Sequence, residues 1–131
     1  MECPNCGTET VAFAIPEAVR DALPEDRPGG ALCPRCLRVT PIDDPPAEQP
    51  DWRSVASAFP TDAEAGATTA TLFALVDSLA LYRAEIDDVV RHAESLGVDV
   101  LLVLDRVAAD DAVDPHFEID RRRRQLEQLL A

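Results

Sequence analysis

The chain has 131 residues, and its 25 acidic and 12 basic residues give it a formal net charge of −13 at pH 7. A chain of this length forms one or two small domains. No uninterrupted apolar run is long enough to cross a bilayer, so we do not expect a membrane-spanning protein.

All four cysteines lie in two CxxC motifs, Cys3-Pro-Asn-Cys6 and Cys33-Pro-Arg-Cys36. Each motif turns the backbone so that two sulfur atoms face one point. Two such motifs together provide the tetrahedral four-cysteine set that a structural Zn²⁺ binds. We therefore predict one structural zinc ion held by Cys3, Cys6, Cys33 and Cys36.

Three other interpretations of the cysteines are an iron site of the rubredoxin kind, two disulfides and a pair of thioredoxin-like redox motifs. Iron is the strongest of the three because it accepts the same thiolate ligands. Disulfides are rare in a reducing cytosol, and we expect a cytoplasmic protein because no apolar signal segment precedes Cys3. A redox CxxC motif usually follows a strand and opens a helix of a βαβ unit, and neither motif has that context.

The segment between the two motifs predicts a strand and a short helix. Residues 10–15 alternate as in a half-buried strand, and a helix follows over residues 16–23 between two prolines. Residues 27–30 are predicted to form a turn, and residues 37–42 a pairing strand. We predict a zinc ribbon over residues 1–42, with two or three short strands and a short helix, whose folding depends on the metal.

A change in composition divides the rest of the chain. Residues 43–51 are acidic, rich in proline and without apolar periodicity, which predicts an extended linker. Residues 52–131 contain no cysteine and are rich in helix-forming residues, which predicts a helical domain. The expected fold class is α+β, with the ribbon followed by an all-α bundle of about four to five helices.

The first two helices of this domain have recognisable N-terminal signals. Asp51 is the predicted N-cap of a short amphipathic helix over residues 52–59. Thr61 or Asp62 is predicted to cap a second helix, whose first half is weakened by Gly66 and three threonines.

A third helix is predicted over residues 86–96, with Gly97 as the residue that ends it. The sequence leaves open whether the second and third helices are continuous or bent near Tyr82. Residues 98–107 suit a buried strand or a helix. We predict a helix because Asp99 is a suitable cap and no partner strand is visible in this half of the chain.

A last helix is predicted from Asp114 to Leu130, with Asp114 as N-cap and Pro115 at the first helical position. It contains four consecutive arginines at residues 121–124, which spread around the helix axis rather than forming one stripe.

The middle two of these arginines, Arg122 and Arg123, are predicted at the edge of the buried face of this helix. There they can pair with nearby acids, and the candidates are Glu118, Glu127, Asp77 and Asp105. A patch that binds a protein partner and a patch that contacts phosphates are the alternatives, although phosphate binding normally needs a clustered basic surface.

The sequence lacks three common enzyme motifs: a phosphate-binding glycine-rich loop, GxSxG and HExxH. His92 is predicted at the rim of an apolar helix face and His116 in the first turn of the last helix, as solvated or capping residues rather than bases. Four cysteines also close the coordination of a zinc ion, whereas catalytic zinc keeps an open position. We predict that the protein is not an enzyme and has no catalytic residue.

The charged residues are of an unusual kind. Every basic residue is arginine, lysine is absent, and 15 of the acids are aspartate. This composition resembles that of proteins from salt-in halophiles, whose acidic surfaces stay hydrated in multimolar salt. At about 1 M salt the Debye length is ~3 Å, so repulsion among the excess acids is screened. We therefore expect a halophilic protein that is unstable at low salt.

The whole chain resembles a family of uncharacterised haloarchaeal zinc-ribbon proteins, a domain of unknown function. The likeness rests on four segments: residues 3–13, 31–38, 79–83 and 114–130. The resemblance implies a cytoplasmic protein of a halophilic archaeon with a zinc ribbon and no established activity.

Two functions are consistent with these features. The first is a non-enzymatic interaction or adaptor protein, in which zinc stabilises the ribbon and the helical domain binds a protein partner or a second copy of the chain. The alternative is a nucleic-acid-associated, transcription-related regulator that uses the ribbon and residues 121–124. The first is favoured because residues 1–42 contain six acids against four arginines.

Overall fold

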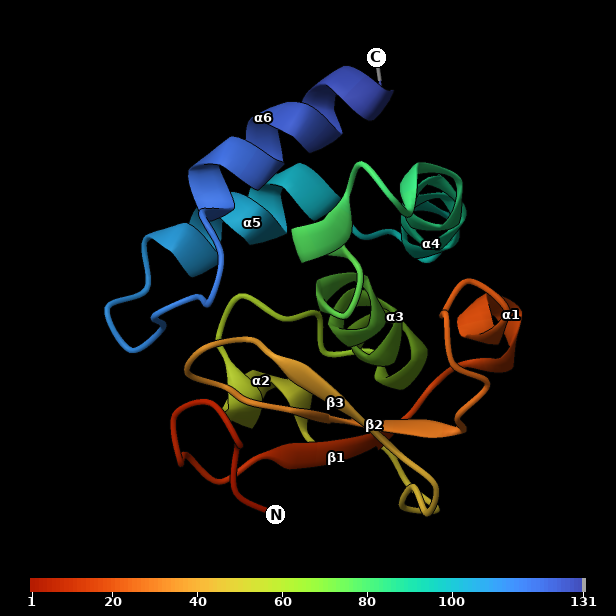
Figure 1. The fold of residues 1–131 in the computed structure, drawn as a ribbon, viewed down its shortest axis with the longest axis vertical. Coiled ribbons are helices and arrows are strands. Elements are labelled where there is room, and N and C mark those ends of the chain that lie inside the picture. The colour runs from red at the N-terminus through yellow and green to blue at the C-terminus, as the bar shows by residue number, and fades with distance from the viewer. Residues whose placement is uncertain (131) are drawn as a thin grey trace.

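The structure is a computed structural model that describes residues 1–130 (Figure 1). Three strands and one short helix come first, and the rest of the chain is helical. In chain order the elements are β1 (Val11–Ala14), α1 (Glu17–Arg20), β2 (Gly29–Leu32), β3 (Val39–Ile42), α2 (Trp52–Val55), α3 (Ala63–Phe73), the 3₁₀ helix η1 (Val76–Ser78), α4 (Arg83–Ser95), α5 (Val100–Ala108) and α6 (Ile119–Leu130). The predicted α+β class, a ribbon that carries the cysteines followed by helices, is confirmed.

The three strands form one antiparallel sheet in the order β1-β2-β3. The prediction of a turn at residues 27–30 is wrong in its second half, because Gly29 and Gly30 begin the central strand. Gly30 pairs with Phe13 on one side and with Pro41 on the other. A Cβ atom on Gly30 would lie 2.8 Å from the Phe13 ring, so this close approach requires glycine in the strand.

Helix α3 forms in full despite the glycine and threonines that weaken its first half. The Asp62 carboxylate accepts a hydrogen bond from the backbone N–H of Ala65 and caps the helix. Three threonine hydroxyls donate to carbonyl oxygens four residues earlier, and these residues are Thr68, Thr69 and Thr71. Their hydroxyls are therefore satisfied inside the helix, which allows threonine in a buried position.

The helices that follow α3 settle two questions that the sequence left open. The chain leaves α3 at Phe73 and passes through η1 before α4 begins, so the second and third predicted helices are separate. Most of residues 98–107 are helical, because α5 begins at Val100 and the Asp99 carboxylate caps it by accepting a hydrogen bond from the Leu102 N–H. Gly97 has the positive φ of 87° that ends a helix in a left-handed residue.

Three predicted helices are shorter in the structure. Residues 16–23 and 52–59 each contain only one helical turn, α1 and α2. The prediction that Asp114 caps the last helix is wrong, since α6 begins at Ile119. The physical reason lies in residues 114–116, whose backbone groups bind the ribbon instead of opening a helix.

Helix α3 lies between the sheet and the outer helices, with α1 and α4 on one side and α5 and α6 beyond it (Figure 1). It packs against α4 and β3, while α5 packs against α6. This arrangement places the helical part of the chain directly on the ribbon.

One hydrophobic core runs through the ribbon and the helices. Five of the six aromatic residues form a continuous chain of ring contacts, with neighbouring centroids 5.5 to 6.4 Å apart. In contact order these are Phe13, Trp52, Phe59, Phe73 and Phe117. The ribbon therefore packs against the helical part, a point that the sequence left undecided. The predicted domain boundaries, at residues 42 and 52, stay a prediction.

Part of the proline-rich segment between the ribbon and the helices contacts β1. Gln49 donates a hydrogen bond from its side-chain nitrogen to the carbonyl of Ala14, so this part of the segment lies against the strand.

Within residues 1–130, no helix combines the length and the apolar character needed to span a membrane.

Candidate metal centre

The four cysteine sulfur atoms all lie within 4.8 Å of one another. The Sγ atoms of Cys3 and Cys36 are 3.6 Å apart, and those of Cys6 and Cys33 are 3.4 Å apart. A tetrahedral ion with metal–sulfur bonds of about 2.3 Å sets its ligand sulfurs about 3.8 Å apart. The sulfur atoms therefore have the spacing of one four-coordinate site. They are too far apart for disulfides, in which the bond is about 2.05 Å long.

The two cysteine motifs fold into the same local structure, which we call the first and second knuckle. In the first knuckle, Cys3 donates its N–H to the Thr8 carbonyl and Gly7 donates to the Cys3 carbonyl. In the second knuckle, the Cys33 N–H bonds to the Arg38 carbonyl and the Leu37 N–H to the Cys33 carbonyl. These paired hydrogen bonds close each loop around its two sulfurs.

The residue after the second cysteine is left-handed in both knuckles. Gly7 has φ 78°, a conformation that glycine adopts without cost. Leu37 has φ 66°, which costs roughly 1–2 kcal/mol for a residue with a Cβ atom. Leu37 is also fully buried in the main core, and burial of a leucine side chain contributes about 1.5–3 kcal/mol. Burial of the Leu37 side chain thus offsets the backbone strain at Leu37 in the second knuckle.

Backbone N–H groups also face the sulfur atoms. The Asn5 N–H lies 3.4 Å from the Cys3 sulfur, and the Cys36 N–H lies 3.4 Å from the Cys33 sulfur. Such N–H groups stabilise the thiolate, which is the negatively charged form of cysteine that binds a metal. The knuckles are therefore arranged for thiolates.

The four thiols differ in acidity. Cys6 is exposed, and hydrogen bonds from the hydroxyl and backbone of Thr8 lower its pKa to about 6. Burial opposes ionisation of Cys3, but hydrogen bonds from the N–H groups of Asn5 and Cys6 and from the side chains of Cys36 and Cys33 together outweigh it and lower the Cys3 pKa. Burial raises the pKa of Cys36, and it raises the pKa of Cys33 to about 12. The buried pair would therefore become thiolates only with a cation beside them.

The C-terminal part of the chain holds the second knuckle in place. The Asp114 N–H donates to the Arg35 carbonyl at 2.6 Å, and the His116 N–H donates to the Cys36 carbonyl at 2.9 Å. The His116 ring adds a hydrogen bond from Nδ1 to the same Cys36 carbonyl at 2.8 Å. The prediction that His116 is a solvated or capping residue of the last helix is wrong.

The other ring nitrogen of His116 faces a charged pair. Its Nε2 atom lies 3.9 Å from Asp77, and the same carboxylate lies 3.6 Å from the guanidinium of Arg122. Only 9% of the His116 side chain is exposed. The imidazole therefore connects the second knuckle to Asp77 of η1, and Asp77 in turn connects to Arg122 of α6. Nothing in the sequence pattern indicated this connection, because its acceptor is a backbone carbonyl.

The arginines of α6 lie as the sequence suggested. Arg123 pairs with Asp105 at 2.7 Å and also contacts Glu127, while Arg122 is near Asp77. These were among the predicted partners. Arg121 and Arg124 are exposed on the other side, and neither has an acidic partner within the described residues.

The second histidine is not part of the centre. His92 Nε2 lies 2.7 Å from the Glu64 carboxylate, so this pair connects α4 to the first turn of α3. The hydrogen bond and ion pair of His92 are made to Glu64, not to a residue of the cysteine knuckles. Within the described residues, the four cysteines are the group of side chains with the geometry of a metal site.

A three-stranded ribbon with two facing cysteine knuckles, packed on a set of helices, defines a small α+β protein with a candidate four-cysteine metal centre. The chain belongs to the DUF6276 family, a family of unknown function, which matches residues 2–130. No curated protein and no solved structure matches the chain.

Proposed function

We propose that the protein binds one Zn²⁺ through Cys3, Cys6, Cys33 and Cys36 and acts as a non-enzymatic interaction or adaptor protein. The observation that carries the proposal is the set of four sulfurs within 4.8 Å of one another. Four thiolates fill a tetrahedral zinc ion and leave it no position for a substrate, so the ion would serve the fold rather than a reaction.

The surroundings of the cysteines support a structural role. Cys3, Cys33 and Cys36 are buried, and the second knuckle is bonded to residues 114–116. A metal that fixes this knuckle would also fix the segment that leads into α6. The helical part would then present a defined surface to a partner.

Metal analysis tests the first half of the proposal. Protein purified without added metal is measured for zinc and iron by mass spectrometry, and its visible absorption spectrum is recorded. One zinc per chain and no visible colour is the expected result. Stoichiometric iron, with the absorption of an iron–thiolate centre, would refute the choice of metal.

The arginines of α6 favour a protein partner over nucleic acid. Arg122 and Arg123 lie near carboxylates, which reduces the positive charge that they offer to phosphates. Arg121 and Arg124 remain as candidates for a contact with nucleic acid, and they lie on one side of α6 because they are three residues apart.

A pull-down separates the two functions. The tagged protein is recovered from a halophilic host in multimolar KCl, and the eluate is analysed by mass spectrometry and ultraviolet absorbance. We expect a stoichiometric protein partner that is retained by the Arg121→Gln/Arg124→Gln variant. Co-eluting nucleic acid that this variant loses, while an Arg122→Gln/Arg123→Gln control keeps it, would establish the nucleic-acid function instead.

We also propose a cytoplasmic, halophilic protein, on the basis of its composition. With 25 acids and no lysine, the chain should need salt to screen its charge of −13. Circular dichroism spectra recorded from 0.1 M to multimolar KCl are the test. We expect loss of helix at low salt, and full structure at both extremes would overturn the proposal.

A further inference from the structure

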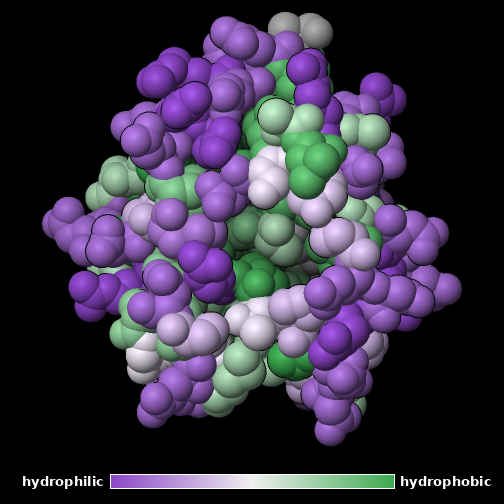
Figure 2. Space-filling view, viewed as in Figure 1, coloured by the Kyte–Doolittle hydropathy of each residue, from purple (hydrophilic) through white to green (hydrophobic). Residues whose placement is uncertain are grey.

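A small apolar pocket opens beside the sheet, away from the cysteines. Figure 2 shows a hollow near the middle of one face, with hydrophobic residues at its floor and mostly hydrophilic residues around it. The pocket has a volume of about 140 Å³ and lies between the end of β1, the α1–β2 loop, β3 and the C-terminal end of α3. Its apolar wall includes Ile15, Leu23, Pro24, Val39, Pro41 and Ala74.

The size of the pocket limits what it can hold. A cavity of about 150 Å³ with an aliphatic and aromatic lining binds benzene. The present pocket therefore accommodates one ring of that size. Pro24 and Pro41 have no backbone N–H, so these parts of the wall offer no hydrogen-bond donor to a polar group. The interior is suited to an apolar ring.

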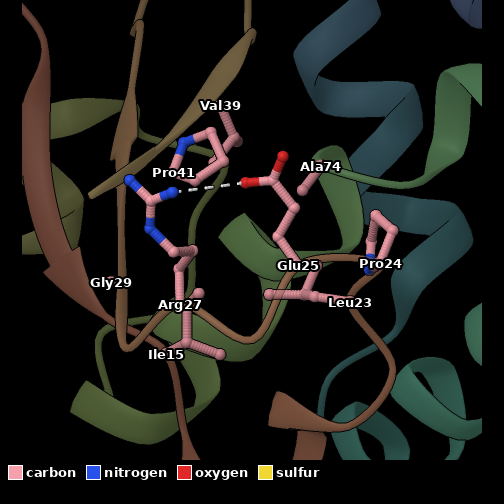
Figure 3. Close-up of a pocket in the computed structure, with 9 residues that line it drawn as sticks. All are labelled: Ile15, Leu23, Pro24, Glu25, Arg27, Gly29, Val39, Pro41 and Ala74. Atoms are coloured by element: carbon pink, nitrogen blue, oxygen red, sulfur yellow. Dashed lines mark ion pairs between the residues drawn. The ribbon is translucent and has the colours of Figure 1, made fainter. Parts of the chain in front are cut away.

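The charged groups of the pocket lie at its mouth. Figure 3 shows Glu25 extending towards Arg27, so that its carboxylate lies between Pro41 and Ala74 in this view. The two charged groups are 3.7 Å apart, which is an ion-pair distance but too long for a hydrogen bond. The Glu25 side chain is 58% exposed, and exposed pairs of this kind are weak.

The mouth carries more negative than positive charge. Arg27 makes its close contact with Asp43, through its Nε atom at 2.5 Å. The guanidinium is therefore already neutralised by Asp43, and the Glu25 carboxylate is left as an acceptor without a hydrogen-bonded cation. A ligand that brings a positive charge to the mouth would complete this pairing.

We propose that the pocket is a binding site for a small aromatic amine, with its ring inside the pocket and its ammonium group at Glu25. An apolar interior with a few oriented polar groups at one end is the usual form of a small-molecule site. This site is independent of the metal centre and of the proposed partner.

The test uses three compounds that share one ring and differ in charge: phenethylamine, phenylacetate and toluene. The full-length, zinc-loaded protein is titrated at the lowest salt that keeps its native spectrum, and the methyl resonances of Ile15, Leu23 and Val39 are followed by NMR. We expect the amine to bind with a dissociation constant of about 1 mM, and the acid to bind about tenfold more weakly or worse.

Two substitutions of exposed alanines provide a matched pair. Ala74→Leu places a larger side chain at the pocket wall, at the C-cap of α3, whose backbone is right-handed. Ala109→Leu makes the same change at the C-cap of α5, also right-handed and away from the pocket. We expect Ala74→Leu to abolish binding of the amine, whereas Ala109→Leu leaves it unchanged.

A third substitution tests the role of charge. Glu25→Gln should remove the preference for the amine over the acid while the ring still binds. The proposal is overturned if the amine shifts none of the three methyl signals, if the acid binds as tightly as the amine, or if the Ala74→Leu variant binds the amine as well as the wild type does.

Discussion

Gly66 is the position where one methyl group should damage the core. It lies in the first half of α3, and a Cβ atom there would be 2.1 Å from Cδ1 and 2.3 Å from Cγ of the Trp52 ring. Normal carbon–carbon contacts are about 3.5–4.0 Å, so the ring and the helix would have to separate by roughly 1.4 Å. Trp52 cannot move freely, because it is 1% exposed and packed between Phe13 and Phe59.

The Gly66→Ala variant is therefore expected to be less stable. Overpacking of a core costs about 1–3 kcal/mol, and we take the upper end because Trp52 is held on two sides. Alanine favours a helix over glycine by ~1 kcal/mol. The difference is a loss of about 2 kcal/mol in the free energy of unfolding, or a melting temperature roughly 8 °C lower for a chain of this size.

The assay is urea unfolding with zinc present, followed by the fluorescence of Trp52, which is the single tryptophan of the chain. A double-mutant cycle with Trp52→Leu, followed by circular dichroism, is the control. In that background the smaller side chain leaves room for the methyl group, and Gly66→Ala should no longer destabilise. A Gly66→Ala variant as stable as the wild type, with unchanged fluorescence, would refute the reasoning.

Three other predictions concern the metal centre. Cys33→Ser should reduce zinc to below one ion per chain and unfold the ribbon, since structural zinc contributes much of the folding free energy of small modules; a folded variant with full zinc content would contradict this. Zinc affinity should fall about 100-fold for each pH unit from 8 to 6, because zinc must displace two protons that the metal-free protein holds on Cys33 and Cys36. Acid therefore favours release of the metal. Competition titrations with a chelator would measure the affinity, and an affinity that does not change with pH would contradict the prediction. His116→Ala should lower the free energy of unfolding by about 1–2 kcal/mol and speed the extraction of zinc by a chelator, because it removes the ring hydrogen bond to Cys36. His92→Ala is its control and should leave the extraction rate unchanged.

The cysteine cluster could be predicted from the sequence because its determinants are local. A CxxC spacing forms a knuckle by itself, and two knuckles with four sulfurs have few other uses. The helices α4 and α5 were predictable for a similar reason, since Asp99 and Gly97 act on the residues next to them. Local chemistry of this kind needs no knowledge of the rest of the fold.

The parts that could not be predicted depend on distant backbone groups. The strand β2 begins with Gly29 and Gly30, which favour a turn when considered alone, and it forms because it has a partner strand on each side. The segment from Asp114 to His116 has good helix-starting residues, yet its N–H groups bind carbonyls of the second knuckle. Any residue supplies such a carbonyl, so no sequence pattern marks the acceptor.

The contact between His116 and Cys36 also sets an order of events during synthesis of the chain. The two residues are 80 positions apart, and a ribosome adds about 5–20 residues per second. The cysteine knuckles are thus complete roughly 4–16 seconds before the histidine that caps the second one has been made. During that interval the nascent ribbon has its four sulfurs but not its C-terminal cover, and this is when we expect the metal to enter.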